Sequence, residues 1–133
     1  MVSPAKDVKA PSLTKFQWSS VTDPSGGVTY NFQLSQDPNF GTIILKKDGL
    51  TETSYQLTDT EKLKSASQAR PYYWRVQAVD GASNVSAWST PQTFVVGYIM
   101  PQWLLVIIYI AAAIFIFAVG LFVGRKWGRG YGF

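Results

Sequence analysis

The feature that most constrains this chain is an uninterrupted apolar run near its C-terminus. From Trp103 to Val123 there is no charged residue, no Asn, no Gln and no Pro. A helix of about 20 apolar residues spans roughly 30 Å, the thickness of a bilayer hydrocarbon core. The alternative is a helix buried in a soluble core, but a chain of 133 residues leaves too little material to surround it. We therefore predict one transmembrane helix over residues 102–124.

Aromatic and basic residues flank this run. Their amphipathic rings and long cationic side chains suit the headgroup level of a membrane. The residues predicted to lie at the membrane interface are Tyr98, Trp103, Arg125, Lys126, Trp127 and Arg129. No charged residue lies between Asp80 and Arg125. The positive-inside rule then predicts a single-pass protein of the cell membrane, with its C-terminus in the cytoplasm and its N-terminal part outside.

The N-terminus leaves the route of insertion open. Its first residues, MVSPAKDVKAPSL, contain no apolar segment of the kind found in signal peptides. Three alternatives remain. A signal and further domains lie upstream, or the single helix translocates the N-terminal domain itself, or the protein is tail-anchored with its domain in the cytosol. The third alternative requires three cations to cross the membrane.

Two glycines near the inner end of the predicted helix are spaced for helix packing. Gly120 and Gly124 form a GxxxG pattern, which lets two helices approach closely. Glycine is also common in membrane helices that face lipid. Both interpretations stay open: association of helices through Gly120 and Gly124, or a lipid-facing pair.

Residues 10–96 carry the pattern of an all-β domain. Short segments alternate between apolar and polar residues, with clusters of turn residues such as Asp23-Pro24 and Asp48-Gly49 between them. Seven strands in about 90 residues predict a β-sandwich of immunoglobulin-like type. The residues expected to fill its core include Trp18, Tyr30, Phe32, Leu34, Phe40, Tyr72, Trp74 and Val76.

The segment from Tyr72 to Ser89, YYWRVQAVDGASNVSAWS, resembles strand F, the F–G loop and the start of strand G of a fibronectin type III domain of the bacterial or archaeal surface kind. Phe16-Gln-Trp18 resembles its strand B, and Ser35–Phe40 the element after strand C. The resemblance implies that Tyr72 is the corner tyrosine, with its hydroxyl bonded to the backbone near Leu63. It also implies a spacer, adhesive or protein-binding module without shared enzymatic activity.

The residue types argue against most catalytic chemistry. There is no Cys and no His, which excludes disulfides, Cys/His metal sites and His-based triads. Most carboxylates fall in predicted turns, where Asp bonds the local backbone. Asp80, Ser83 and Asn84 offer oxygen ligands for Ca²⁺, but in a spacing that matches no strong motif. Asn84-Val85-Ser86 is a glycosylation sequon. We predict no cofactor and no enzymatic activity.

Two surfaces are candidates for contact with a partner. Tyr73, Arg75 and Gln77 share one face of a predicted strand, and Tyr and Arg are favoured in binding patches. The other explanation is an ordinary solvated sheet face. Ile43, Ile44 and Leu45 are consecutive, so one side of their strand exposes apolar surface or is covered. Lys46 and Lys47 beside them are typical of charged residues that prevent an edge strand from pairing with another chain.

These observations predict a fibronectin type III or immunoglobulin-like sandwich with a single membrane anchor. The expected parts are an N-terminal extension (1–9), the sandwich (10–96), a linker (97–101), the helix (102–124) and a basic, aromatic cytoplasmic tail (125–133). We expect a non-enzymatic, membrane-anchored interaction or spacer module outside the cell, and the C-terminal part of a longer surface protein is one form that such a module could take. The alternative is a small accessory subunit of a larger membrane complex. The expected partners are membrane lipid and protein, not nucleic acid, because the net charge of +4 comes mostly from the cations after the helix.

Overall fold

The computed structural model describes residues 2–24, 26–98 and 100–128, and residues 123–128 by their backbone alone. The chain divides into a β unit, Met1–Ile99, and a helical unit, Met100–Phe133. The elements are β1 (Val8–Ala10), β2 (Lys15–Gln17), β3 (Thr29–Ser35), β4 (Ile43–Leu50), β5 (Ser54–Gln56), the 3-10 helix η1 (Asp59–Glu61), β6 (Tyr72–Val79), β7 (Gln92–Val96) and α1 (Gln102–Gly128).

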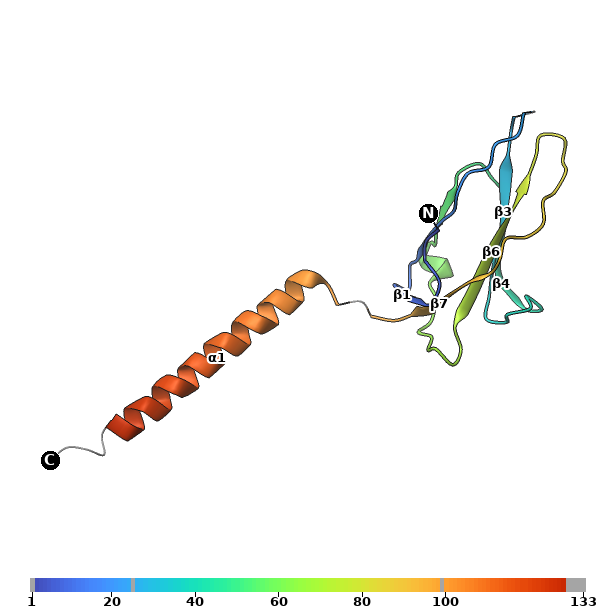
Figure 1. The fold of residues 1–133 in the computed structure, drawn as a ribbon. Helices are drawn as coiled ribbons and strands as arrows, with labels where there is room; N and C mark the ends of the chain where they lie inside the picture. Colours follow the sequence, from blue (N-terminus) through green and yellow to red (C-terminus); the bar gives the residue numbers. More distant parts are fainter. Residues whose placement is uncertain (1, 25, 99, 129–133) are drawn as a thin grey trace. The chain divides into compact units, whose positions relative to one another are not determined.

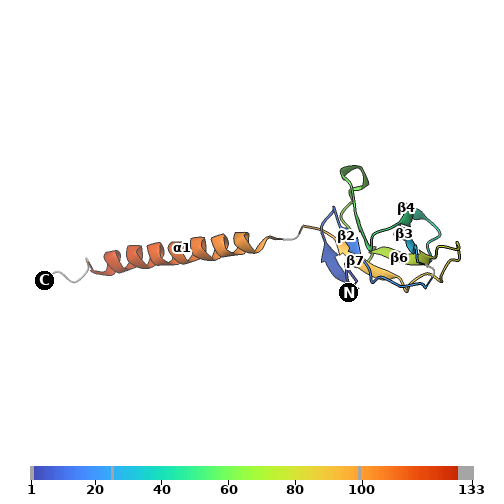
Figure 2. The same cartoon turned by 90° about the horizontal axis from the view of Figure 1, so that it is seen from above.

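The β unit is a sandwich of two sheets. The larger sheet has the order β1-β7-β6-β3-β4, and the smaller one pairs β2 with β5. In both ribbon views β6 lies beside β3, and β3 beside β4 (Figures 1 and 2). All pairs are antiparallel except β1 with β7, which is parallel. The predicted fold class, an immunoglobulin-like β-sandwich followed by one apolar helix, is confirmed.

The N-terminal segment differs from the expectation. Residues 1–9 were expected to precede the sandwich, yet Val8 pairs with Phe94 and Lys9 with Val95 in the larger sheet. Ser3 also forms an isolated bridge with Gln17. The sandwich therefore includes part of the predicted extension, because the free edge of β7 offers backbone partners to β1.

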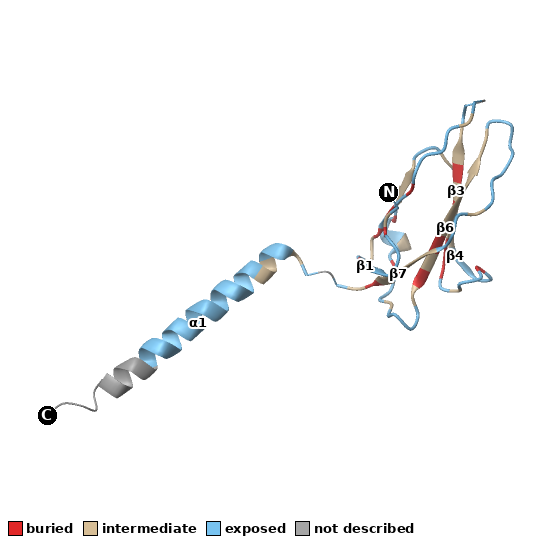
Figure 3. Ribbon diagram, viewed as in Figure 1, coloured by how far each residue is buried: buried red, intermediate tan, exposed pale blue. Residues whose placement is uncertain are grey.

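An aromatic cluster fills the space between the sheets. Phe16 is fully buried, and its ring centroid lies 4.8 Å from that of Phe32, 5.3 Å from that of Trp74 and 5.6 Å from that of Phe94. Figure 3 shows buried segments along β3 and β6, which flank this cluster. The cluster of buried residues is Ala10, Phe16, Trp18, Tyr30, Phe32, Leu34, Leu57, Leu63, Tyr72, Trp74, Phe94 and Val96.

Two expected core residues lie outside the central cluster. Val76 is only half-buried and packs against the cluster from its margin. Phe40 is buried, but it stacks on the guanidinium of Arg75 and is not part of the cluster. Arg75 follows Trp74 on β6, and consecutive side chains of a strand point to opposite faces of its sheet. Phe40 therefore covers the outer face of the larger sheet.

The strand register defines two ends of the sandwich. Ser35 pairs with Tyr73 and Tyr72 with Phe94, so β7 finishes at the end that also holds loops 10–14, 36–42 and 57–71; we name this the exit end. Thr29 pairs with Val79 at the opposite end, which holds loops 18–28, 51–53 and 80–91; we name this the far end.

The helical unit consists of α1. The N–H of Leu104 donates to the carbonyl of Pro101 at 3.0 Å, which closes the first turn. The helix begins at Gln102, where the predicted span began, and its backbone continues to Gly128. The predicted tail over residues 125–133 therefore starts inside the helix. The part from Gln102 to Phe122 is long and apolar enough to cross a membrane, and no residue of its most apolar stretch is buried in the structure (Figure 3).

Candidate functional site

β4 is one of the two edges of the larger sheet, because it pairs only with β3; β1 is the other edge. Ile43 and Ile44 are 37% and 45% exposed, so both predicted apolar residues at the start of β4 face solvent. Leu45, which we also expected on an interaction surface, packs against the core cluster instead. The ammonium of Lys46 lies 2.9 Å from the carboxylate of Asp48 on the same strand. The exposed apolar part of this edge is therefore limited to Ile43 and Ile44.

The outward face of β6 is not a free surface. The guanidinium of Arg75 lies 4.0 Å from the ring centroid of Phe40 and 4.4 Å from that of Trp88, an arrangement in which both rings attract the cation. Its Nε and Nη2 also donate to Oε1 of Gln33, at 3.0 and 2.8 Å. Tyr73 and Gln77 beside it are half-buried. The predicted binding patch at Tyr73, Arg75 and Gln77 therefore has its central cation engaged within the domain.

A short segment after the 80–85 loop closes the edge of β6. The N–H of Ser86 donates to the carbonyl of Ala78 at 2.9 Å, and the hydroxyl of Ser86 accepts from the N–H of Ala78 at 2.9 Å. Ser89 makes the same pair of bonds with Val76, at 2.8 and 3.1 Å. This pairing explains how Trp88, between the two serines, is held over Arg75. Sequence reasoning missed this role, although the residues lie inside the segment that carried the resemblance.

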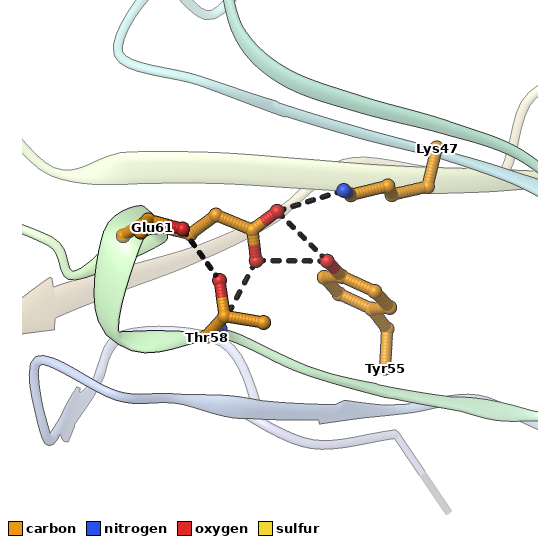
Figure 4. Close-up of polar contacts among 5 residues, drawn as sticks. Lys47, Tyr55, Thr58 and Glu61 are labelled. Atoms are coloured by element: carbon orange, nitrogen blue, oxygen red, sulfur yellow. Dashed lines mark hydrogen bonds and ion pairs between the residues drawn. The ribbon is translucent and has the colours of Figure 1, made fainter.

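A polar cluster connects β4 of the larger sheet with β5 of the smaller sheet (Figure 4). The ammonium of Lys47 on β4 lies 2.7 Å from Oε1 of Glu61 in η1. The hydroxyl of Tyr55 on β5 lies 2.9 and 2.8 Å from the two carboxylate oxygens, and the N–H of Thr58 donates to Oε2 at 3.0 Å. We name Lys47, Tyr55, Thr58 and Glu61 the clamp, because they tie β4 of one sheet to β5 of the other.

The charges of the clamp are fixed by these contacts. Burial favours the neutral form of Glu61, but the Lys47 ammonium and the Thr58 and Tyr55 donors outweigh it and lower the pKa of Glu61 to about 2. The contact with Glu61 raises the pKa of Lys47. Burial, aided by the bond to Glu61, raises the pKa of Tyr55. Near neutral pH every member keeps one protonation state, so the clamp suits a structural role rather than proton transfer.

The corner tyrosine is where the resemblance implied. The hydroxyl of Tyr72 donates to the carbonyl of Lys64 at 3.1 Å, one residue after Leu63. Burial raises the pKa of Tyr72. This bond fixes loop 57–71 to the start of β6 at the exit end.

The Asp80 carboxylate, one of the candidate Ca²⁺ ligands, is occupied by groups of its own loop. Oδ1 of Asp80 accepts from the N–H groups of Ala82 and Asn84, at 2.9 and 2.7 Å, and Oδ2 accepts from the Asn84 amide at 2.8 Å. These bonds, that from the Asn84 side chain first, lower the pKa of Asp80. Within the described residues no group of three or more His, Cys, Asp or Glu side chains is placed to hold a metal ion. The Asp80 carboxylate therefore shapes its loop.

A cleft of about 330 Å³ opens beside the core. The indoles of Trp18 and Trp74 line it, and neither Nε1–H has an acceptor among the residues described. The rest of its lining includes Val21, Val76 and Gln77, and no residue of the lining is charged. The wall of the cleft is therefore uncharged and combines aromatic and aliphatic side chains with hydroxyl and amide groups.

Of the predicted interface residues, Tyr98 and Trp103 are 68% and 63% exposed. Gly120 lies on an open helix surface, where an added Cβ would meet no atom within 4 Å. Of Gly124, Arg125, Lys126 and Trp127 only the helical backbone is described, and Arg129 lies outside the described residues.

Comparison with known proteins adds a family. Residues 14–100 match the model of the family described as Rha78A-like, N-terminal immunoglobulin domain. The match covers most of the sandwich and identifies an immunoglobulin-like domain, and it does not test the resemblance to the fibronectin type III kind. No curated protein and no solved structure matches the chain. With the two-sheet sandwich and the family match together, the chain belongs to the Rha78A-like N-terminal immunoglobulin domains.

Proposed function

We propose that this protein is a membrane-anchored immunoglobulin-like module, held in the lipid by α1, whose sandwich spaces or binds another protein. The observation that carries the proposal is the exposure of α1. Ile110, Phe115, Phe117 and other large apolar side chains between Gln102 and Phe122 are more than half exposed. Burying each such side chain is worth about 1.5–3 kcal/mol, and a bilayer supplies the apolar environment that the chain itself does not.

The orientation follows from the cations that end the helical unit. Arg125, Lys126 and Arg129 favour the cytoplasmic side, which supports a sandwich outside the cytoplasm. In the alternative, tail-anchored arrangement the sandwich lies in the cytosol, where protease added to sealed cells would not reach it.

A non-catalytic role is supported by the hydrogen bonds and ion pairs that hold the charged side chains within the domain. The Arg75 guanidinium, the Glu61 carboxylate and the Asp80 carboxylate are each bound to neighbours that fix structure. A surface suited to a protein partner is the edge of β4 at Ile43 and Ile44, where a strand edge without a neighbouring strand accompanies exposed apolar side chains.

A second arrangement uses the helix as the binding element. The open surface at Gly120 would let a neighbouring helix approach closely, which favours an accessory subunit of a larger membrane complex. Purification in mild detergent distinguishes the two. Co-purifying membrane subunits that are lost in Gly120→Leu would support the accessory subunit, and a partner lost in Ile44→Lys would support the β4 edge.

The anchor is tested by extraction of membranes with alkaline carbonate. We expect the full chain to stay in the pellet. The double variant Ile110→Lys/Ile114→Lys should be released, because each charge at the centre of a span costs about 2.5–3.5 kcal/mol. The control Ile110→Leu/Ile114→Leu should stay. Release of the unchanged chain would refute the anchor. Protease added to sealed cells should digest the sandwich, and protection until lysis would reverse the orientation.

A further inference from the structure

The cations of the sandwich loops gather at one of its two ends. The loops of the far end contain Asp23, Glu52 and Asp80 but neither Lys nor Arg. Lys62, Lys64 and Arg70 lie in loop 57–71 at the exit end. Lys9 belongs to the same end, because it pairs with Val95 near the finish of β7. We name Lys9, Lys62, Lys64 and Arg70 the basic end.

The cations of the basic end surround the point where the chain leaves the sandwich. The side chain of Lys9 lies against Gly97: a Cβ on that glycine would be 2.6 Å from Cε of Lys9. The N–H of Ala66 donates to the carbonyl of Val96 at 2.9 Å, which fixes loop 57–71 to the last residue of β7. Lys64 and Arg70 are therefore placed close to the last strand residue before the linker.

These four side chains are exposed and available. Among the residues that the structure describes, none of them has an ion-pair partner within the chain. The acidic groups at this end are Asp37, Asp59 and Glu61. Asp37 accepts the N–H groups of Asn39 and Gly41, and Glu61 is neutralised by Lys47. Cations remain in excess at the exit end.

The basic end also contains a hollow. A depression of about 490 Å³ lies between Lys64 and Arg70, and its remaining lining includes Gln36, Ser65 and Ser67. Its wall therefore combines two cations with hydroxyl and amide groups and contains no carboxylate. Lys, Arg and hydroxyl groups are the donors that bind phosphate oxygens.

We propose that the basic end binds the headgroups of anionic phospholipids, with a lipid phosphate in the hollow between Lys64 and Arg70. The inference rests on the proposed membrane anchor. Only residues 97–101 separate β7 from α1, so the linker spans at most about 18 Å. If the span begins at Gln102, the linker keeps the exit end within that distance of the lipid. Anionic headgroups attract the cations of the exit end and repel the carboxylates of the far end, so the far end is expected to point away from the membrane surface.

The test uses the full chain in lipid nanodiscs. One set contains phosphatidylcholine alone, and the other contains phosphatidylcholine with phosphatidylglycerol. Brief acetylation followed by mass spectrometry measures the reactivity of each lysine. An anionic surface attracts each nearby basic residue by about 1 kcal/mol, which raises the ratio of lipid-bound to free side chain about fivefold. Because the bound ammonium is shielded from the reagent, Lys62 and Lys64 should be acetylated about fivefold more slowly in the anionic discs. Lys46 on β4 should react equally in both, and high salt should remove the difference.

A paired variant tests the hollow itself. In Lys64→Gln/Arg70→Gln, the extra protection of Lys62 in anionic discs should fall to less than half, whereas Lys46→Gln should leave it unchanged. The melting temperature of each variant in detergent shows whether the sandwich is folded. Equal lysine reactivity in the two lipids would overturn the inference. Equal protection by inorganic phosphate in detergent would also overturn it, in favour of a soluble anion. Failure of the chain to remain in discs would instead refute the membrane anchor.

Discussion

Removing the charge of Glu61 isolates the contribution of the clamp to the stability of the sandwich. Glu61→Gln keeps an oxygen for Tyr55 and Thr58 but loses the ion pair with Lys47, whose nitrogen lies 2.7 Å from Oε1. The pKa of Glu61 is lowered from 4.5 to about 2. Expressed fully as stability, that lowering would be about 3 kcal/mol at neutral pH. The side chain of Lys47 is 35% exposed, so solvent screening reduces the value. We expect a loss of about 1–2 kcal/mol.

The sign of the pH dependence follows from the direction of the pKa change. Because folding lowers the pKa of Glu61, its stabilisation is fully present above about pH 4.5. It decreases as the pH falls from 4.5 toward 2, and it is lost below the folded-state pKa of about 2, where the carboxylate is protonated in both states. The difference in stability between the wild-type chain and Glu61→Gln should therefore be constant from pH 5 to pH 7 and shrink between pH 4.5 and pH 2.

The assay is unfolding of the full chain in mild detergent, followed by tryptophan fluorescence at a series of pH values. A loss of about 1–2 kcal/mol corresponds to a decrease in melting temperature of roughly 5–10 °C for a domain of this size. Asp48→Asn is the matched control, because its ion pair with Lys46 is about half exposed and worth less than about 1 kcal/mol. Parallel pH profiles for the wild-type chain and Glu61→Gln down to pH 2 would refute the reasoning.

Three further substitutions test the sandwich, each by denaturant unfolding in detergent. Phe16→Ala should destabilise by about 3–5 kcal/mol, because it removes the ring that contacts Phe32, Trp74 and Phe94; a loss below about 1 kcal/mol would mean that the core is packed differently. Tyr72→Phe should cost about 1 kcal/mol through the lost bond to the Lys64 carbonyl, and unchanged stability would show that this bond contributes nothing. Arg75→Lys should cost about 1 kcal/mol and increase the exposure of Trp88 to a soluble fluorescence quencher, since an ammonium cannot stack between two rings as a planar guanidinium does. Unchanged quenching would argue against the stack.

Local patterns in the sequence were sufficient for the main architecture. The apolar run located the start of α1, and alternation placed Tyr30, Phe32 and Leu34 on one buried face of β3. Strand β1 was missed because its three residues have no periodic pattern and pair in parallel with β7, far away in the sequence. Such pairing depends on a free strand edge that only the folded domain provides.

The two side-chain assemblies differ in how far sequence could reveal them. Thr58 and Glu61 form a capping box, a spacing that sequence alone can suggest, but the partner of Glu61, Lys47, comes from β4 of the larger sheet. Phe40 could not be placed by alternation. The Asp37 carboxylate accepts two backbone N–H groups of its turn, and Phe40 adopts a φ of 57°, which directs the ring to the outer face. The turn geometry, and not the apolar character of the residue, decided its position.

Cations on the two sides of the proposed span act at different stages. Arg125 and Lys126 follow the apolar run directly, so they influence orientation during insertion, when the chain is still unfolded. Lys64 and Arg70 are distant from the span in sequence and reach the exit end only through the register of β6 and β7. Replacing Lys64 and Arg70 by Gln should therefore leave protease accessibility of the sandwich in sealed cells unchanged. Replacing Arg125 and Lys126 by Gln should increase the fraction with the reverse orientation. If the first pair altered orientation as strongly as the second, folding would have to precede insertion.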